Sequence, residues 1–158
     1  MTHDAYTPHN HHHCIDAALN NARSLCAEQG ARLTPIRQRV LELVWSSHKP
    51  VGAYDLLPTL AAEGFNSAPP TVYRALDFLL GLGLVHRIST LNAFIGCSQP
   101  NTDHASCFFI CRDCGKAQEL AASEVQALTA QVERALGVKV EQQTTELTGL
   151  CPACLEQH

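Results

Sequence analysis

Four cysteines in the C-terminal half of the chain form two CxxC pairs, Cys111 with Cys114 and Cys151 with Cys154. Each pair can place two thiolates on one tetrahedral ion, and two pairs complete the shell of a structural zinc site. Disulfide bonds and thiol redox chemistry are the alternatives. The N-terminus has neither the basic start nor the apolar stretch of a signal peptide, which disfavours disulfides. Two CxxC motifs also favour a shared metal over redox chemistry, so we predict a structural Zn²⁺ at these residues.

A second set of potential metal ligands lies around the first CxxC pair: His86, Cys97, His104 and Glu119. Two imidazoles, one thiolate and one carboxylate suit tetrahedral zinc, whereas iron sites are richer in nitrogen and oxygen ligands. Spacing alone leaves another interpretation open, in which each residue is a buried polar group or a surface side chain. If the four met at one ion, metal occupancy would control the relative geometry of the two halves of the chain.

The composition is that of one ordinary domain or two small ones, with 158 residues of which 46% are hydrophobic. No apolar run is long enough to cross a bilayer, so we expect a cytoplasmic protein without a membrane segment. The net charge of -4 argues against nucleic-acid binding by the chain as a whole. Lys and Arg nevertheless outnumber Asp and Glu by six to four in residues 31–90, and the balance reverses to four against eight in residues 91–158. Separate functions for the two parts are therefore expected.

Residues 1–14 are polar and rich in histidine, without a hydrophobic period, so we predict a disordered tail. Loose metal binding by this segment is the alternative to a solvated terminus, because five potential ligands crowd together in it. They are His9, His11, His12, His13 and Cys14. A helix is predicted over residues 16–29, where Gly30 would end it.

Three further helices and a hairpin are predicted over the rest of the N-terminal half. Thr34 and Pro35 begin the first, residues 53–63 form the second with an early turn or a kink at Pro58, and Pro69 and Pro70 begin the third. Two alternating runs, residues 84–89 and 93–97, then indicate a hairpin. Residues 15–97 therefore have the pattern of a winged helix-turn-helix domain. The exposed face of its last helix would carry Thr71, Tyr73 and Arg74 toward a DNA groove.

Residues 98–106 are polar and turn-rich, as expected of a hinge. Residues 107–158 have the pattern of strands around an amphipathic helix near residues 125–136, with a further strand over 138–147 before the last CxxC pair. A unit of this size buries little apolar surface alone, which favours dimerisation. The predicted fold class is α+β, with a winged helix-turn-helix domain followed by a small α/β dimerisation domain that contains a zinc knuckle.

Taken together, these segments resemble the ferric uptake regulator (Fur) family over roughly residues 16–155. The segments that carry the resemblance are RLTPIRQRVLELV, AYDLL, PPTVYRALDFLLGLGLVHR, CFFICRDCGK and CPAC. The family implies a winged-helix domain joined by a hinge to a dimerisation domain, in a repressor that binds double-stranded operator DNA when loaded with metal. The zinc-sensing branch is the most similar, which implies a zinc-responsive homodimer that represses zinc-uptake genes.

The resemblance also implies roles for individual residues. The structural zinc of the family corresponds to Cys111, Cys114, Cys151 and Cys154, and the regulatory zinc to His86, Cys97, His104 and Glu119. Two Zn²⁺ per chain are therefore expected. The DNA-contacting positions correspond to Tyr54 and Arg74, and Thr71, Tyr73 and Arg37 are further candidates.

One departure from the family distinguishes its branches. Iron-sensing members carry a histidine-rich HHDHxxC run, whereas this chain reads DHASCFFIC, with Phe108 at a position of a ligand histidine. An iron or peroxide sensor is thus the alternative. A zinc enzyme is disfavoured, because four protein ligands close each proposed site and a deaminase would need PCxxC with an upstream HxE.

Overall fold

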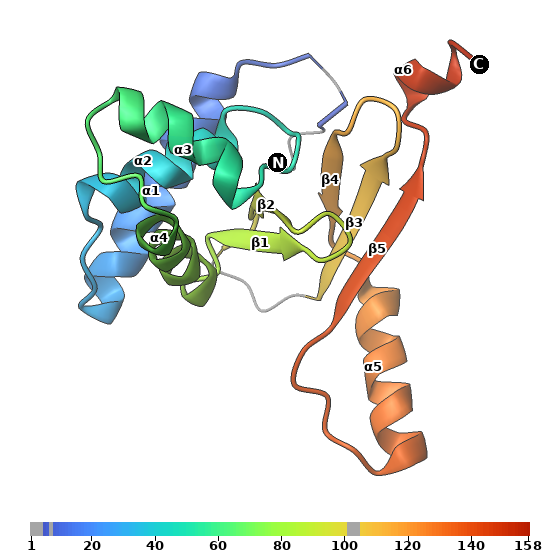
Figure 1. The fold of residues 1–158 in the computed structure, drawn as a ribbon. Coiled ribbons are helices and arrows are strands. Elements are labelled where there is room, and N and C mark those ends of the chain that lie inside the picture. The colour runs from blue at the N-terminus through green and yellow to red at the C-terminus, as the bar shows by residue number, and fades with distance from the viewer. Residues whose placement is uncertain (1–4, 7, 101–104) are drawn as a thin grey trace.

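The computed structural model describes residues 5–6, 8–100 and 105–158. Four helices form most of the first domain (Figure 1): α1 (His11–Gln29), α2 (Pro35–Trp45), α3 (Ala53–Ala62) and α4 (Pro69–Gly81). Proline opens α2 and α4, where its missing N–H has no helical partner to lose. Gly30 ends α1 with a φ of 63°. The helix α3 continues through Pro58, as the predicted range over residues 53–63 requires, and the proline does not interrupt it.

The apolar stripes of these helices meet in one core. Val40, Leu60, Leu76 and Leu79 are completely buried in it. Removing such side chains from water is the main contribution to the stability of the domain, at roughly 1.5–3 kcal/mol for each large aliphatic residue. The core holds α4 in place while its opposite face remains available to solvent.

The predicted hairpin follows α4 as β1 (Val85–Ile88) and β2 (Ala93–Gly96), which pair antiparallel. An isolated bridge from Val51 to Phe94 ties this wing to the segment before α3. Gly96 packs directly against the indole of Trp45, because a Cβ at this position would lie 2.1 Å from Trp45 Cε2. The wing therefore sits firmly against the end of α2.

The second domain is a three-stranded sheet in the order β4-β3-β5. Its strands are β3 (Ser106–Cys111), β4 (Ala117–Leu120) and β5 (Thr144–Gly149). Strand β5 runs parallel to β3 and begins six residues later than the predicted strand over 138–147. The connection between β4 and β5 contains α5 (Ser123–Leu136), and the short α6 (Pro152–Leu155) follows β5. In Figure 1, α5 extends away from the helices of the first domain.

The two domains share a small apolar core. Ile88 and Ile95 of the wing pack with Phe108, Ile110 and Ala117 of the sheet, and all five are buried. Two polar contacts reinforce this packing: the Ala117 N–H donates to the His48 carbonyl at 2.9 Å, and Glu146 accepts from the wing turn. The wing thus lies on β3 and β4 rather than being free of the second domain.

The N-terminal segment differs from the prediction of a disordered tail. The side chain of Asn10 caps α1 by accepting from the His12 N–H at 2.9 Å, so the helix begins at His11, five residues before the predicted start. Ala5 is buried, and the Tyr6 hydroxyl donates to the carbonyls of Phe109 at 3.3 Å and Lys116 at 3.2 Å. The prediction is therefore wrong for residues 5, 6 and 11–14. Within the described residues, no helix is long and apolar enough to span a membrane.

Candidate metal centres and nucleic-acid interface

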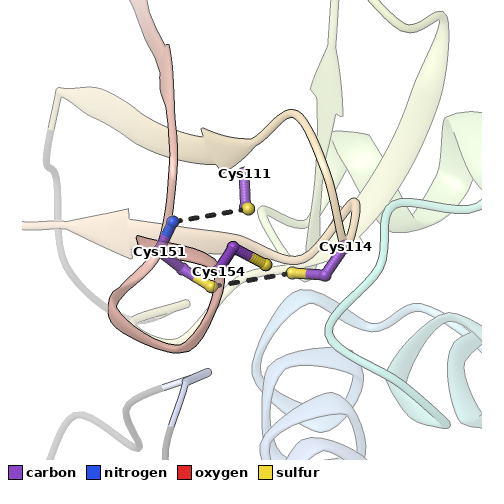
Figure 2. Close-up of side chains that lie close together, drawn as sticks. All are labelled: Cys111, Cys114, Cys151 and Cys154. Atoms are coloured by element: carbon purple, nitrogen blue, oxygen red, sulfur yellow. Dashed lines mark hydrogen bonds between the residues drawn. The ribbon is translucent and has the colours of Figure 1, made fainter. Parts of the chain in front are cut away.

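The four cysteines of the CxxC motifs converge at one end of the second sheet (Figure 2). Parallel pairing of β3 with β5 places Cys111 opposite Gly149, so Cys151 arrives beside the end of β3. Cys114 lies in the turn after β3, and Cys154 lies in α6. All eight cysteines of the chain are free, which disagrees with the disulfide alternative.

The sulfur positions suit a tetrahedral zinc ion. Cys114 Sγ and Cys151 Sγ are 3.8 Å apart, and all four Sγ atoms lie within 4.8 Å of one another. A Zn–S bond of about 2.3 Å gives a tetrahedral S···S edge of about 3.8 Å. Burial raises the pKa of Cys111, but backbone N–H groups that point at its sulfur outweigh this and lower the pKa to about 6. The neighbouring Cys151 and burial instead raise the pKa of Cys154 to about 12, and burial also raises the pKa of Cys114. Cys111 is therefore biased toward the thiolate, and a bound cation would allow Cys114 and Cys154 to ionise as well.

A second cluster lies where the wing meets the second domain. It consists of His86 on β1, Cys97 directly after β2, and Glu119 on β4, whose ligand atoms lie within 4.8 Å of one another. His86 Nε2 is 3.1 Å from Glu119 Oε1, and Cys97 Sγ is 4.0 Å from the same oxygen. His104, the fourth residue predicted here, lies outside the described residues.

The chemistry of this second cluster also suits a cation. Glu119 is only 7% exposed, and the N–H and hydroxyl of Ser98 each donate to its Oε2 at 3.1 Å. Burial raises the pKa of Cys97 to about 12, with the nearby Glu119 charge as a second cause. A bound cation would balance the carboxylate and allow the thiol to ionise. One imidazole, one thiol and one buried carboxylate fit Zn²⁺ among the common divalent ions.

A third cluster of potential ligands was not predicted from the sequence as a site. It unites His9 and Cys14, both in the histidine-rich segment, with His48 after α2. The crowding of His9 and Cys14 was visible in the sequence. His48 gave no such signal, because no other potential ligand lies near it in the chain.

The candidate DNA-contacting residues occupy the beginnings of α3 and α4. Tyr54 is 64% exposed, and its ring meets Tyr73 edge-on with centroids 6.4 Å apart. Arg74, which follows Tyr73 on α4, is exposed, and Thr71 in the first turn of α4 is half-buried. Arg37 lies elsewhere, with its guanidinium 3.7 Å from the ring centroid of Phe78. To contact DNA, the guanidinium of Arg37 would have to leave that ring.

Comparison with known proteins identifies the family of the chain. The model of the ferric uptake regulator family matches residues 28–148. The chain belongs to the Fur family. Among Fur-family relatives, the zinc uptake regulation protein of Escherichia coli strain K12 is 39% identical over 141 residues, which cover 87% of this chain and 81% of the relative.

Solved structures of zinc uptake regulators match the whole arrangement of this Fur-family chain. A zinc uptake regulator complexed with zinc and DNA has a TM-score of 0.86 and 37% identity, covering 90% of this chain and 96% of the other. The holo form of XcZur has a TM-score of 0.80 and 41% identity, covering 90% and 99%. These matches confirm the predicted α+β fold, with a winged-helix domain followed by a small α/β domain.

The apo form of XcZur is a less similar structure than the holo form. Its TM-score is 0.50 at 43% identity, although it covers 89% of this chain and 97% of the other. Sequence similarity is nearly equal for the two forms, so the difference in TM-score reflects conformation. In overall structure, this Fur-family chain is therefore more similar to the holo form than to the apo form.

Proposed function

We propose that this Fur-family protein is a zinc-responsive transcriptional repressor that binds operator DNA as a zinc-loaded homodimer and represses zinc-uptake genes. The observation that carries the proposal is that the ligands of the second cluster come from both domains. His86 and Cys97 belong to the wing region, and Glu119 belongs to the second domain. A cation binds better to the arrangement that unites these ligands than to one that separates them, and so favours that arrangement. The similarity to the relatives named for zinc uptake regulation supports this function.

The two predicted metal centres have different roles in the proposal. Cys111, Cys114, Cys151 and Cys154 hold a structural Zn²⁺ that completes the fold of the second domain. His86, Cys97, Glu119 and, from the resemblance, His104 hold the regulatory Zn²⁺. Each chain thus binds two zinc ions in these centres. The structural ion stabilises a domain with a small core, whereas the regulatory ion selects the domain arrangement.

DNA recognition falls to the N-terminal ends of α3 and α4. Arg74 can donate two hydrogen bonds to a guanine edge or to a phosphate, and the exposed Tyr54 offers a hydroxyl and an aromatic ring. Thr71 and Tyr73 lie on the same end of α4 and complete the contact surface. Because the wing and β4 share the regulatory site, zinc would set the direction in which α4 faces the second domain.

Dimerisation falls to the exposed apolar surface of the second domain. No residue of α5 is buried within the chain, and Leu128 and Leu136 are 55% and 70% exposed. Leu147 on β5 is 51% exposed. A second copy of the chain that covers this surface would stabilise both domains and present two copies of α4 to two half-sites.

Iron or peroxide sensing is the alternative function on the same fold. The ligand chemistry favours zinc over it, because a buried thiol and a single carboxylate replace the nitrogen- and oxygen-rich set that iron prefers. A zinc enzyme would need an open coordination position, which four converging thiols do not leave.

The test is operator binding as a function of free zinc, on DNA selected by the zinc-loaded protein, together with a count of zinc per chain. DNA binding by the wild type should rise steeply as the free zinc concentration increases. Glu119→Ala should remain a folded dimer but need far more zinc, whereas the control Glu141→Ala, an exposed glutamate, should behave as wild type. An unchanged zinc dependence of Glu119→Ala would exclude the proposed regulatory site. Equal activation by Fe²⁺ would support the alternative function.

A further inference from the structure

Three potential metal ligands, His9, Cys14 and His48, meet between the N-terminus of α1 and the turn after α2, and the ring of His11 lies beside them. The Nε2 atoms of His9 and His48 point at each other at 2.6 Å. Ring centroids are 4.6 Å apart for His9 and His48, 4.9 Å for His9 and His11, and 5.0 Å for His11 and His48. Cys14 is 4% exposed, and its sulfur lies within 4.8 Å of ligand nitrogens of both His9 and His48.

The local structure explains why these residues meet and their neighbours do not. His11 and Cys14 are three residues apart on α1, so they share one helix face, while His12 and His13 are exposed on other faces. His9 directly precedes the capping residue Asn10 and folds back to the same point. The turn after α2 then brings His48 from a distant part of the chain.

One polar atom beside this cluster has no protein partner among the described residues. His11 Nδ1 is buried and has no hydrogen-bond partner among the residues that the structure describes. Buried polar groups in folded proteins are nearly always satisfied, so such an atom needs a ligand. Three imidazoles around one sulfur also bury little apolar surface, and simple hydrophobic packing therefore does not explain their convergence.

We propose that His9, Cys14 and His48 bind a third zinc ion, with His11 as the fourth ligand. Imidazole nitrogens and a thiolate are the ligands that zinc prefers, and four of them form a closed tetrahedral site. Zn–N bonds of about 2.0–2.1 Å require N···N separations of about 3.3 Å, so His9 and His48 need to move apart by less than about 1 Å. The inference concerns residues outside the two centres described above and does not depend on the proposed regulation.

This third site lies against both domains. A cavity of about 190 Å³ has Cys14 and His48 on its wall together with Cys97 and Glu119 of the second cluster. The carbonyl of His48 accepts the Ala117 N–H of β4. Zinc at the third site would therefore fasten the N-terminal segment and the α2–α3 turn beside the regulatory centre.

The test is a zinc count on the full-length protein without a polyhistidine tag, after equilibration with buffered free zinc and competition by a chromophoric chelator. Wild type should hold three zinc ions per chain, and Cys14→Ser and His48→Gln should each hold one fewer. His12→Gln and His13→Gln are matched controls from the same segment and should retain all three. With Co²⁺ as the probe, Cys14→Ser should lose the part of the thiolate-to-cobalt absorption that arises from the third site.

Two zinc ions per chain in wild type, or an unchanged count in both Cys14→Ser and His48→Gln, would overturn the inference. Circular dichroism on each variant separates loss of the ion from loss of the fold. Failure of the proposed regulation has a different signature, because it would appear as an unchanged zinc dependence in Glu119→Ala with the third ion still present.

Discussion

Replacing Glu146 by alanine should weaken the contact that holds the wing on the second domain. The carboxylate of Glu146 on β5 accepts the Ser89 N–H at 2.6 Å, the Thr90 N–H at 3.3 Å and the Thr90 hydroxyl at 2.5 Å. These bonds join residues 56 or 57 positions apart and cross the boundary between the domains. Their loss should favour arrangements in which the wing has left the sheet.

The expected magnitude follows from the number and exposure of these bonds. Hydrogen bonds to a charged group contribute about 1.5–3 kcal/mol each when buried, but this contact is open to solvent. With that exposure, each of the two short hydrogen bonds contributes about 1 kcal/mol to the stability of the closed arrangement and the long one contributes little, so the contact contributes about 2 kcal/mol in total. Because 1.4 kcal/mol corresponds to a factor of ten, the equilibrium between the two arrangements should shift by about 30-fold. If the metal-free protein mostly has its domains apart, the zinc concentration for half-maximal DNA binding rises by the same factor.

The assay is fluorescence anisotropy of labelled operator DNA against buffered free zinc, for wild type, Glu146→Ala and the control Glu141→Ala. Both substitutions remove one negative charge from neighbouring positions, but Glu141 is exposed. Glu146→Ala should shift the zinc midpoint upward by up to about 30-fold at an unchanged zinc count. A midpoint within twofold of the control would refute the reasoning that this contact holds the bound arrangement.

The same contact has a defined dependence on pH. Burial raises the pKa of Glu146, but the hydrogen bonds from Thr90 and Ser89 outweigh it and hold the pKa below the ordinary value of 4.5. A carboxyl group with a depressed pKa stabilises the folded arrangement above its unfolded pKa and loses this contribution as the pH falls through its folded pKa. The difference between Glu146→Ala and wild type should therefore be constant between pH 6 and 8 and disappear only in acid.

Gly96→Ala should lower the free energy of unfolding by about 1–3 kcal/mol in urea melts, because the new Cβ would lie 2.1 Å from Trp45 Cε2. Gly81→Ala is its control and should be neutral or stabilising by up to about 1 kcal/mol, since nothing lies within 4 Å of the added atom; equal effects would contradict the packing argument. Cys111→Ser should lose one zinc ion and unfold the second domain, because structural zinc contributes about 10 kcal/mol or more to such folds. Hydrogen exchange would detect this as a loss of protection in the second domain. Arg74→Ala should weaken operator binding by about 1–3 kcal/mol in anisotropy titrations with zinc present, with relaxed selectivity at one position if Arg74 contacts a base. Unchanged affinity would exclude Arg74 from the interface.

Local patterns predicted most of the helices and the hairpin. The helices α2 and α4 follow from proline at the first helical position and apolar residues at helical spacing, which are interactions within a few residues of one another. The start of α1 was missed, because a polar cap at Asn10 replaces the apolar period there. The helix α3 has nearly its predicted range despite Pro58, since packing of Leu56 and Leu60 in the core outweighs one lost hydrogen bond.

The candidate metal sites also divide into those whose ligands are close along the chain, which the sequence predicted, and those whose ligands are distant, which it predicted less well. Each CxxC pair was recognisable because its two sulfurs are close along the chain. Residues that are distant in the chain gave weaker signals: Glu119 was a candidate only beside His86 and Cys97, and His48 was not a candidate at all.

By itself, the sequence determined the kinds of ligand, the helix-forming segments and the family, because these depend on residue types and on spacings of a few residues. Only the tertiary structure decided which ligands meet. Parallel pairing of β3 with β5 brings Cys151 to Cys111, and packing of the wing on β4 brings Glu119 to His86. The turn after α2 likewise brings His48 to His9. The physical reason is that a metal site requires distances of a few ångströms between side chains, and for residues far apart in the chain only strand pairing and domain packing determine those distances.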